Sequence, residues 1–251
     1  MTKSKGKKRG CLLALFIAFF LFAVVSLFLE FYIPSKAADL AAEKIMTDYK
    51  LKKKPEITID MHPLLYKLFV GEVDRVSISA EDVKLPERPE ISKVDAEVKG
   101  IHFSLLEIIK TRQPAAIKRI DEGGARIVLS EKAVNEFMAN NLAGSTIKLR
   151  EDGLWYVTSL SYIGAGTAMS IPGDVKVITG DTVAFQPDID RITILPLSQE
   201  EKDYLAGALA VKYRIDEMPE GVSLKKITVQ SGRMIIDCEF TGTNLLKMGS
   251  V

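Results

Sequence analysis

The N-terminal segment and the rest of the chain follow two different hydrophobic patterns. Residues 11–29 read CLLALFIAFFLFAVVSLFL, in which Ser26 is the only ordinary polar residue. The hydrocarbon core of a bilayer is about 30 Å thick, and roughly 20 apolar residues of helix cross it. Phe31, Tyr32 and Ile33 extend the run, and Pro34 is expected to end it. The pattern predicts a transmembrane helix over residues 11–33.

Basic residues gather on the N-terminal side of this helix. Five of the 34 Lys and Arg residues lie within the first nine positions. The positive-inside rule then keeps residues 1–10 in the cytoplasm and places the body outside, in a single-pass protein of the cell membrane. The alternative is a secreted protein, because Ser35-Lys36-Ala37 resembles a signal-peptide cleavage site. The apolar run is longer than a signal peptide needs, which favours the uncleaved anchor.

Residues 34–55 are predicted to form a helical stalk and linker. Residues 36–50 are rich in alanine and glutamate, which favour a helix. The lysines at positions 52–54, followed by Pro55, would end it. They are interpreted as a solvated linker, with contact to anionic lipid headgroups as the alternative.

From Glu56 onward the dominant pattern alternates between apolar and polar residues. Such alternation predicts strands with one apolar face and one wet face, and therefore an antiparallel sheet. Turns are expected at Arg150–Gly153, Ile171–Asp174, Thr179–Asp181 and Gln230–Gly232. The predicted strands contain Ile57–Ile59, Val76–Ala80, Val94–Val98, Ile147–Leu149, Trp155–Val157, Val175–Val177, Val183–Phe185, Ile192–Ile194, Ile227–Val229 and Met234–Phe240, with strand-like sequence again at Val211.

Three short amphipathic helices interrupt the strands. One follows Pro63 and ends at Gly71, and a second begins after the N-cap residue Ser130. A third begins at Ser198, which forms a capping box with Glu201. The pattern therefore predicts an α+β domain over residues 56–243, followed by a C-terminal tail over residues 244–251. The apolar face of its sheet either closes over the helices as a core or leaves an apolar groove for a ligand.

Composition narrows the possible functions only slightly. The formal net charge of +1 lacks the basic excess of a dedicated nucleic-acid-binding protein. Of the two cysteines, Cys11 lies in the predicted membrane helix, so Cys238 has no disulfide partner in the body and is interpreted as a small buried hydrophobe.

Candidate catalytic and metal-binding residues are isolated from one another. His62 and His102 lie in no recognisable ligand spacing. Asp188 and Asp190 form an Asp-x-Asp pair, which we interpret as turn chemistry because two carboxylates make a weak metal motif. Phosphate-binding loops and nucleophile motifs are missing from the sequence. The sequence therefore predicts no enzyme activity and no cofactor.

The order of motifs resembles that of a known family. Residues 57–71, ITIDMHPLLYKLFVG, are followed by the strand-like residues 73–80, and further matches lie at 94–101, 129–137 and 218–229. Together these motifs span most of residues 55–243 and resemble the LmeA-like phospholipid-binding family of exported bacterial proteins. The resemblance implies a long curved antiparallel sheet with helices in its concavity and an apolar groove for acyl chains. It brings no catalytic residues.

The resemblance makes phospholipid, or a related amphiphile, the expected partner, bound beside the membrane in cell-envelope lipid or glycolipid metabolism. A structural or interaction module with a closed core is the main alternative. An envelope hydrolase or glycosyl-transfer accessory that uses Asp188 and Asp190 is a more distant one. The apolar lining is predicted to come from the first two internal helices and from facing strand positions, namely Leu64, Leu68, Phe69, Val134, Phe137, Met138 and Trp155.

Overall fold

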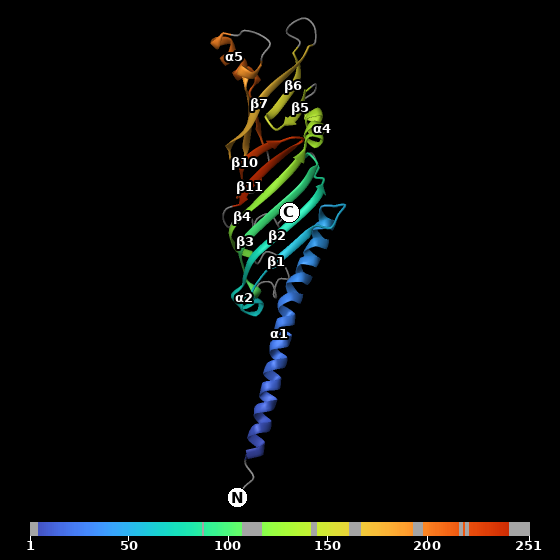
Figure 1. Cartoon of the computed structure of the whole chain (residues 1–251), viewed down its shortest axis with the longest axis vertical. Helices are drawn as coiled ribbons and strands as arrows, with labels where there is room; N and C mark the ends of the chain where they lie inside the picture. The colour runs from blue at the N-terminus through green and yellow to red at the C-terminus, as the bar shows by residue number, and fades with distance from the viewer. Residues whose placement is uncertain are drawn as a thin grey trace.

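The computed structural model describes residues 5–86, 88–106, 117–141, 145–160, 167–192, 198–215, 218 and 221–240. Figure 1 shows an elongated body of strands, from one end of which a single long helix projects. The α+β class predicted from the sequence is confirmed, and the described strands close no barrel. The expected single long sheet is instead divided into two antiparallel sheets.

The larger sheet lies next to the long helix and has six strands in the order β1-β2-β3-β4-β11-β10. Every neighbouring pair in it is antiparallel. The strands are β1 (Glu56–Asp60), β2 (Glu72–Val83), β3 (Ile91–Phe103), β4 (Ile117–Ser130), β11 (Arg233–Phe240) and β10 (Val222–Gln230).

The smaller sheet has five strands in the order β5-β6-β7-β8-β9, and it lies at the end of the body away from the long helix (Figure 1). Its strands are β5 (Ser145–Arg150), β6 (Gly153–Leu160), β7 (Thr167–Thr179), β8 (Thr182–Pro187) and β9 (Val211–Arg214).

The short helices lie at the ends and at the junction of the two sheets. Helix α2 (Leu64–Val70) contacts β2, and α4 (Glu131–Asn141) contacts β4 and β5. Helix α5 (Gln199–Leu209) contacts β8 and the 3-10 turn η3 (Ile189–Arg191). Their predicted caps are confirmed. Ser130 Oγ accepts a hydrogen bond from the Ala133 amide, and Ser198 forms the capping box with Glu201.

Gly71 ends α2 as predicted, in the left-handed conformation with φ of 78°. A Cβ atom at this position would also collide with the carbonyl oxygen of Phe103, at the end of β3. Glycine is therefore required both by the backbone conformation and by the close approach of β3.

The prediction that Pro34 ends the first helix is wrong. Helix α1 runs without a break from Lys5 to Asp48, so the predicted stalk helix is its C-terminal part. Pro34, Ala38 and Ala42 are buried at helical spacing, and this side of α1 packs against β1. Small side chains let the helix approach the strand closely, and this packing outweighs the backbone hydrogen bond that proline cannot make.

The lysines after α1 form ion pairs on the body. Lys53 Nζ lies 2.9 Å from Glu81 and 3.2 Å from Asp82. Lys54 Nζ lies 3.1 Å from Asp39, on the adjacent face of α1. These pairs fold the end of the predicted linker back onto the helix and the sheet.

Three local predictions about strands and turns are corrected. Strand β4 is absent from the predicted strands, because Gly123 and Gly124 interrupt the alternating pattern in its middle. The turn predicted at Ile171–Asp174 lies inside β7, where Ile171 and Gly173 pair with residues of β6. Ile192 follows η3 rather than lying in a strand, and residues 193–197 are outside the described part of the chain. The domain boundary proposed at residue 243 is also outside it.

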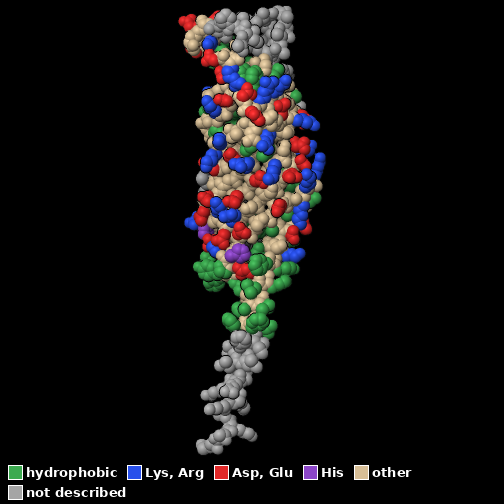
Figure 2. All heavy atoms as spheres, viewed as in Figure 1, with side chains coloured by type: hydrophobic (Ala, Val, Ile, Leu, Met, Phe, Trp, Pro, Cys, Tyr) green, Lys and Arg blue, Asp and Glu red, His purple; other side chains and the backbone are tan. Residues whose placement is uncertain are grey.

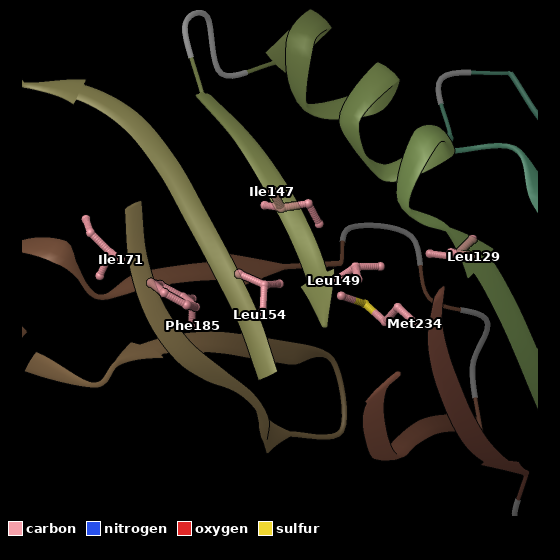
Figure 3. Close-up of a cluster of buried hydrophobic side chains, with 7 residues drawn as sticks. All are labelled: Leu129, Ile147, Leu149, Leu154, Ile171, Phe185 and Met234. Carbon is pink, nitrogen blue, oxygen red and sulfur yellow. The ribbon is translucent and has the colours of Figure 1, made fainter. Parts of the chain in front are cut away.

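The main hydrophobic core fills the junction between the two sheets (Figure 3). Leu129 and Met234 enter it from the six-stranded sheet, and the other five residues come from β5, β6, β7 and β8. Ile171 is 0% exposed, the lowest value in this core. A second and smaller cluster joins the end of α1 to the sheet through Leu51, Ala80 and Val83.

Candidate functional site

The six-stranded sheet has one face made almost entirely of apolar residues, which we call the apolar face. Antiparallel register aligns its side chains in rows that cross the strands. The central row consists of Ile57, Ile78, Ala96, Ala125, Cys238 and Leu224. The rows beside it consist of Ile59, Val76, Val98, Gly123, Phe240 and Val222 on one side, and of Ala80, Val94, Ile127, Ile236 and Ile227 on the other.

The middle of the central row is built from small side chains. Ala96, Ala125 and Cys238 follow one another across β3, β4 and β11. The flanking rows place larger residues beside them, and the ring of Phe240 occupies the space above Gly123, where a Cβ atom would lie 2.7 Å from its Cδ2. The side chains of the central row therefore project least from the sheet, and this row crosses the strands.

The β3 part of the apolar face is only partly shielded from solvent, whereas Cys238 and Leu224 of the central row are 9% and 7% exposed. Every residue of β3 is half-buried, including Val94, Ala96 and Val98 on the apolar face. A covering layer would bury the apolar side chains of such a central strand completely. The described helices contact mainly the rim of the sheet: α1 at β1, α2 at β2 and α4 at the end of β4.

The opposite face of the same sheet is polar, and its charges are mutually paired. A hollow of about 720 Å³ on this face is lined mainly by polar residues of β1, β2, β3, β4 and β11. Arg126 Nε lies 2.8 Å from Asp237 Oδ1, and Lys99 Nζ lies 3.2 Å from both Glu97 and Glu122. Such a surface suits water and ions rather than hydrocarbon.

Asp95 illustrates the electrostatics of the polar face. Lys93 Nζ lies 2.8 Å from its carboxylate, and Ser79 Oγ donates a hydrogen bond of 2.7 Å to it. These two donors hold the pKa of Asp95 below its usual value, and Lys93 has the larger effect. These two contacts therefore stabilise the ionised form of the carboxylate.

A second and smaller cavity lies beside the contact between α1 and the edge of the six-stranded sheet. It has a volume of about 330 Å³ and lies between α1 and β1. Its lining includes Glu30 and Phe31 from the helix and Ile57 and Ile59 from the strand. The cavity therefore lies beside the edge of the apolar face that is nearest to α1.

The structure does not bring the seven predicted lining residues to one place. On α2, Leu64 is 1% exposed, Leu68 is half-buried and Phe69 is 88% exposed. Helices α2 and α4 lie at different ends of the six-stranded sheet (Figure 1).

The three predicted residues on α4 lie beside the junction core. Val134 and Met138 are half-buried and pack against that core. The ring of Phe137 meets the ring of Tyr213 edge-on, with their centres 6.3 Å apart. Helix α4 therefore closes one end of the six-stranded sheet rather than lying across its middle.

Trp155 lies on the other side of β6 from the junction core. Its neighbour Leu154 enters the core and is 5% exposed. The guanidinium groups of Arg150 and Arg191 lie 4.8 and 5.4 Å from the centre of the indole ring, and its Nε1 donates to Asp152. Cation–π contacts and a hydrogen bond thus account for its position.

The isolated polar candidates of the sequence have local partners. His102 lies next to Arg119 and Asp121, and Asp190 pairs with Lys202 at 2.7 Å. Cys238 is 9% exposed, as expected for a small hydrophobe, and burial raises the pKa of its thiol. Among the described residues, no group of three His, Cys, Asp or Glu side chains is placed to hold a metal ion.

The alternating sequence pattern predicted the strands of the apolar face except β4, and it did not predict the central row. The row results from the register in which the strands pair, which aligns residues as far apart in sequence as Ile57 and Cys238. Alternation within one strand does not determine that register. Ala96 was the available signal, because it is a small residue between Val94 and Val98 in an alternating strand.

The pattern of the LmeA-like phospholipid-binding family matches residues 29–239. The match covers most of the chain, which therefore belongs to this family. It begins at the end of the apolar part of α1 and includes the whole six-stranded sheet. Comparison with curated proteins and with solved structures found no match.

Proposed function

We propose that this protein is a membrane-anchored phospholipid-binding protein that holds an acyl chain along the central row of the apolar face. The main observation in support is the half-buried state of apolar residues on the central strand β3, in a chain whose family binds phospholipid. It acts without catalysis in cell-envelope lipid or glycolipid metabolism, where moving lipid between the membrane and another site is the simplest role.

Helix α1 supplies the anchor in this proposal. From Phe19 onward it is long and apolar enough to cross a membrane, and Phe19, Phe22 and Phe28 are all more than half exposed. The basic residues before it keep the N-terminus in the cytoplasm, so the body lies outside. Cleavage after residue 37 would instead release the body into the same compartment.

Transfer of lipid between bilayer and protein needs no energy source. Burying an acyl chain away from water gains about 0.8 kcal/mol per CH₂ group, whether the surroundings are lipid or an apolar protein face. The two gains nearly cancel when the chain moves from one to the other. A protein that only exchanges lipid therefore requires an apolar surface next to the membrane, rather than a nucleotide site.

The predicted helix residues fit this proposal as contacts at the two ends of the apolar face. Leu64, Leu68 and Phe69 lie at the end near α1, and Val134, Phe137 and Met138 lie at the junction with the smaller sheet. Between these two ends, the residues of the central row would contact the acyl chain. Trp155 is the least suited of the seven, because two arginines cover its ring.

Native mass spectrometry of the full chain, extracted in mild detergent, tests the proposal. We expect a population that carries one phospholipid, and Ala96→Phe should lower that occupancy at least about tenfold by filling the central row. Ser77→Phe is the matched control, since it adds the same ring to the polar face of the adjacent strand. A chain that is always empty, or equal losses in both variants, would favour a structural module with a closed core.

A further inference from the structure

Helix α2 has the reverse of the usual polarity of a surface helix. Its lysine, Lys67, is 14% exposed and lies 2.6 Å from Asp74 and 3.0 Å from Glu72 on the body. Its apolar side chains are exposed instead, with Phe69 at 88% and Tyr66 at 62%. A helix that faces water exposes its charges and buries its aromatic residues.

The exposed apolar residues form a surface at one end of the body, which we call the apolar end surface. It consists of Leu65, Tyr66, Phe69, Val70 and Leu106, each about half exposed or more. Leu106 follows β3, which reaches α2 through a hydrogen bond from the Phe103 amide to the Gly71 carbonyl. Figure 2 shows hydrophobic side chains gathered where α1 leaves the body, whereas charged side chains cover most of the visible body above them.

Polar contacts fix α2 beside one particular turn of α1. The Leu64 amide donates a hydrogen bond of 2.9 Å to Glu30 Oε1, and His62 Nδ1 lies 3.1 Å from the same oxygen. The rings of Phe31 and His62 also lie near each other, with centres 6.2 Å apart. Glu30 is the first charged residue after the apolar run, so this turn of α1 lies at the surface of the bilayer that the helix would cross.

We propose that the apolar end surface inserts into the outer leaflet of the bilayer that α1 crosses. The inference rests on the proposed anchoring by α1, and it assigns to the body a second attachment to the same membrane. Tyr66 and Phe69 suit this depth, because aromatic side chains favour the interface between hydrocarbon and water. Lys67 is turned inward and paired with two carboxylates on the body, so its ammonium group does not face the lipid.

Insertion at this point would connect the bilayer to the candidate lipid site. Helix α2 contacts both α1 and β2, and β2 carries Val76 and Ile78 of the apolar face. An acyl chain leaving the outer leaflet beside α2 would therefore meet the edge of that face without crossing open water.

Tryptophan fluorescence of the full chain in phosphatidylcholine vesicles tests the insertion. The native tryptophan is first replaced by Trp155→Phe, and Phe69→Trp then places the only indole on the apolar end surface. Tyr204→Trp is the matched control, because Tyr204 is 77% exposed on α5, at the far end of the body (Figure 1). Both sites are exposed, so neither substitution disturbs packing.

We expect the indole at position 69 to emit at shorter wavelength and to lose about half or more of its emission to phospholipid brominated in its acyl chains. The indole at position 204 should be quenched only by iodide in the water. An indole at position 69 that responds to both quenchers as position 204 does would overturn the inference. So would one shielded from both, which is the result expected if a second copy of the chain covered this surface.

Flotation of the same vesicles separates this inference from the anchoring on which it rests. A chain that floats with the vesicles while position 69 behaves as in water is anchored by α1 alone, which contradicts insertion of α2. A chain that does not float contradicts the anchoring and the insertion together. The lipid-binding proposal is measured independently, by mass spectrometry of the extracted chain.

Discussion

The junction of the two sheets and the apolar face of the six-stranded sheet are built from the same alternating strands, yet the core residues of the junction are more completely buried than the apolar residues of β3. At the junction, side chains from both sheets meet, and Ile171 and Leu149 are 0% and 3% exposed. Along β3 the same type of side chain remains half-buried. Alternation in a strand therefore determines which face is apolar, whereas the presence of an opposing layer determines whether that face is a dry core.

This difference separates stability from function within one fold. Closely packed residues at the junction stabilise the fold, because removing them would leave a cavity. The partly open face contributes less to stability, since much of its apolar area stays in contact with water. A ligand that covers this face removes its apolar area from water and so stabilises the protein, which is the property that a lipid-binding protein requires.

Ile171→Ala should give the largest effect on stability. The side chain is fully buried, so its truncation should lower the free energy of unfolding by about 2–5 kcal/mol. Ile78→Ala on the apolar face is the matched truncation and should cost about 1 kcal/mol, because Ile78 is only half-buried. Urea denaturation of the lipid-free chain measures both, and equal losses would mean that the two regions are equally closed.

Asn135→Ala should release the edge of the smaller sheet at the junction. Asn135 Nδ2 donates to the Ile147 carbonyl at 2.9 Å, and its Oδ1 accepts from the Ile147 amide at 2.7 Å. Loss of both bonds to buried Ile147 should lower stability by about 1–3 kcal/mol. Lys132→Ala, on the exposed side of the same helix, should change it by less than about 0.5 kcal/mol. A neutral Asn135→Ala would show that this contact is not needed to close the junction.

Cys238 reports on the occupancy of the apolar face. Its raised pKa lowers the fraction of reactive thiolate at pH 8, and burial restricts access, so alkylation by iodoacetamide should be slow. Bound phospholipid should slow it further, by roughly tenfold. The assay uses a Cys11→Ser background. Ser231→Cys, in the exposed turn before β11, is the control, because lipid should not change the alkylation rate at that position. Equal rates with and without lipid would argue against occupancy of the central row.

Asp181 should give the smallest effect, because its side chain lies at an exposed turn and its hydrogen bonds stay within the smaller sheet. Hydrogen bonds from Thr179 and Thr182 lower its pKa to about 2, and Arg214 adds to them. A lowered carboxylate pKa stabilises the fold above about pH 4, and this contribution is lost as the pH falls through 2. Asp181→Asn should therefore flatten the acid dependence of the melting temperature between pH 4 and pH 2. An unchanged slope would contradict the assignment, and Thr179→Val should reproduce part of the flattening.

Local sequence patterns predicted most elements but not how the elements meet. Alternation correctly predicted β2, β3 and β11, and cap residues predicted α4 and α5. The pattern did not predict β4, because it contains Gly123 and Gly124, and glycine disfavours a strand unless neighbouring strands stabilise it. Pro172 and Gly173 similarly favoured a turn where pairing with β6 extends β7 through both residues.

The candidate site depends on long-range register more than on local pattern. Helical spacing drew attention to Phe69, although spacing alone does not show which side of α2 faces the body. The ion pairs that turn Lys67 inward, and so expose Phe69, involve Glu72 and Asp74 on the following strand. Likewise, the packing of the two sheets against each other depends on contacts between β10 and β7, which are distant in sequence.

Photolabelling by a phospholipid with a diazirine in its acyl chain would show directly whether an acyl chain occupies the apolar face. With the full chain in vesicles, α1 should be labelled because it lies in the bilayer, and the account predicts further labels on β2, β3 and β4 at or beside Ile78, Ala96 and Ala125. Excess unlabelled phospholipid should compete these strand labels away. Labels confined to α1 and α2, with none on the strands of the apolar face, would contradict the account.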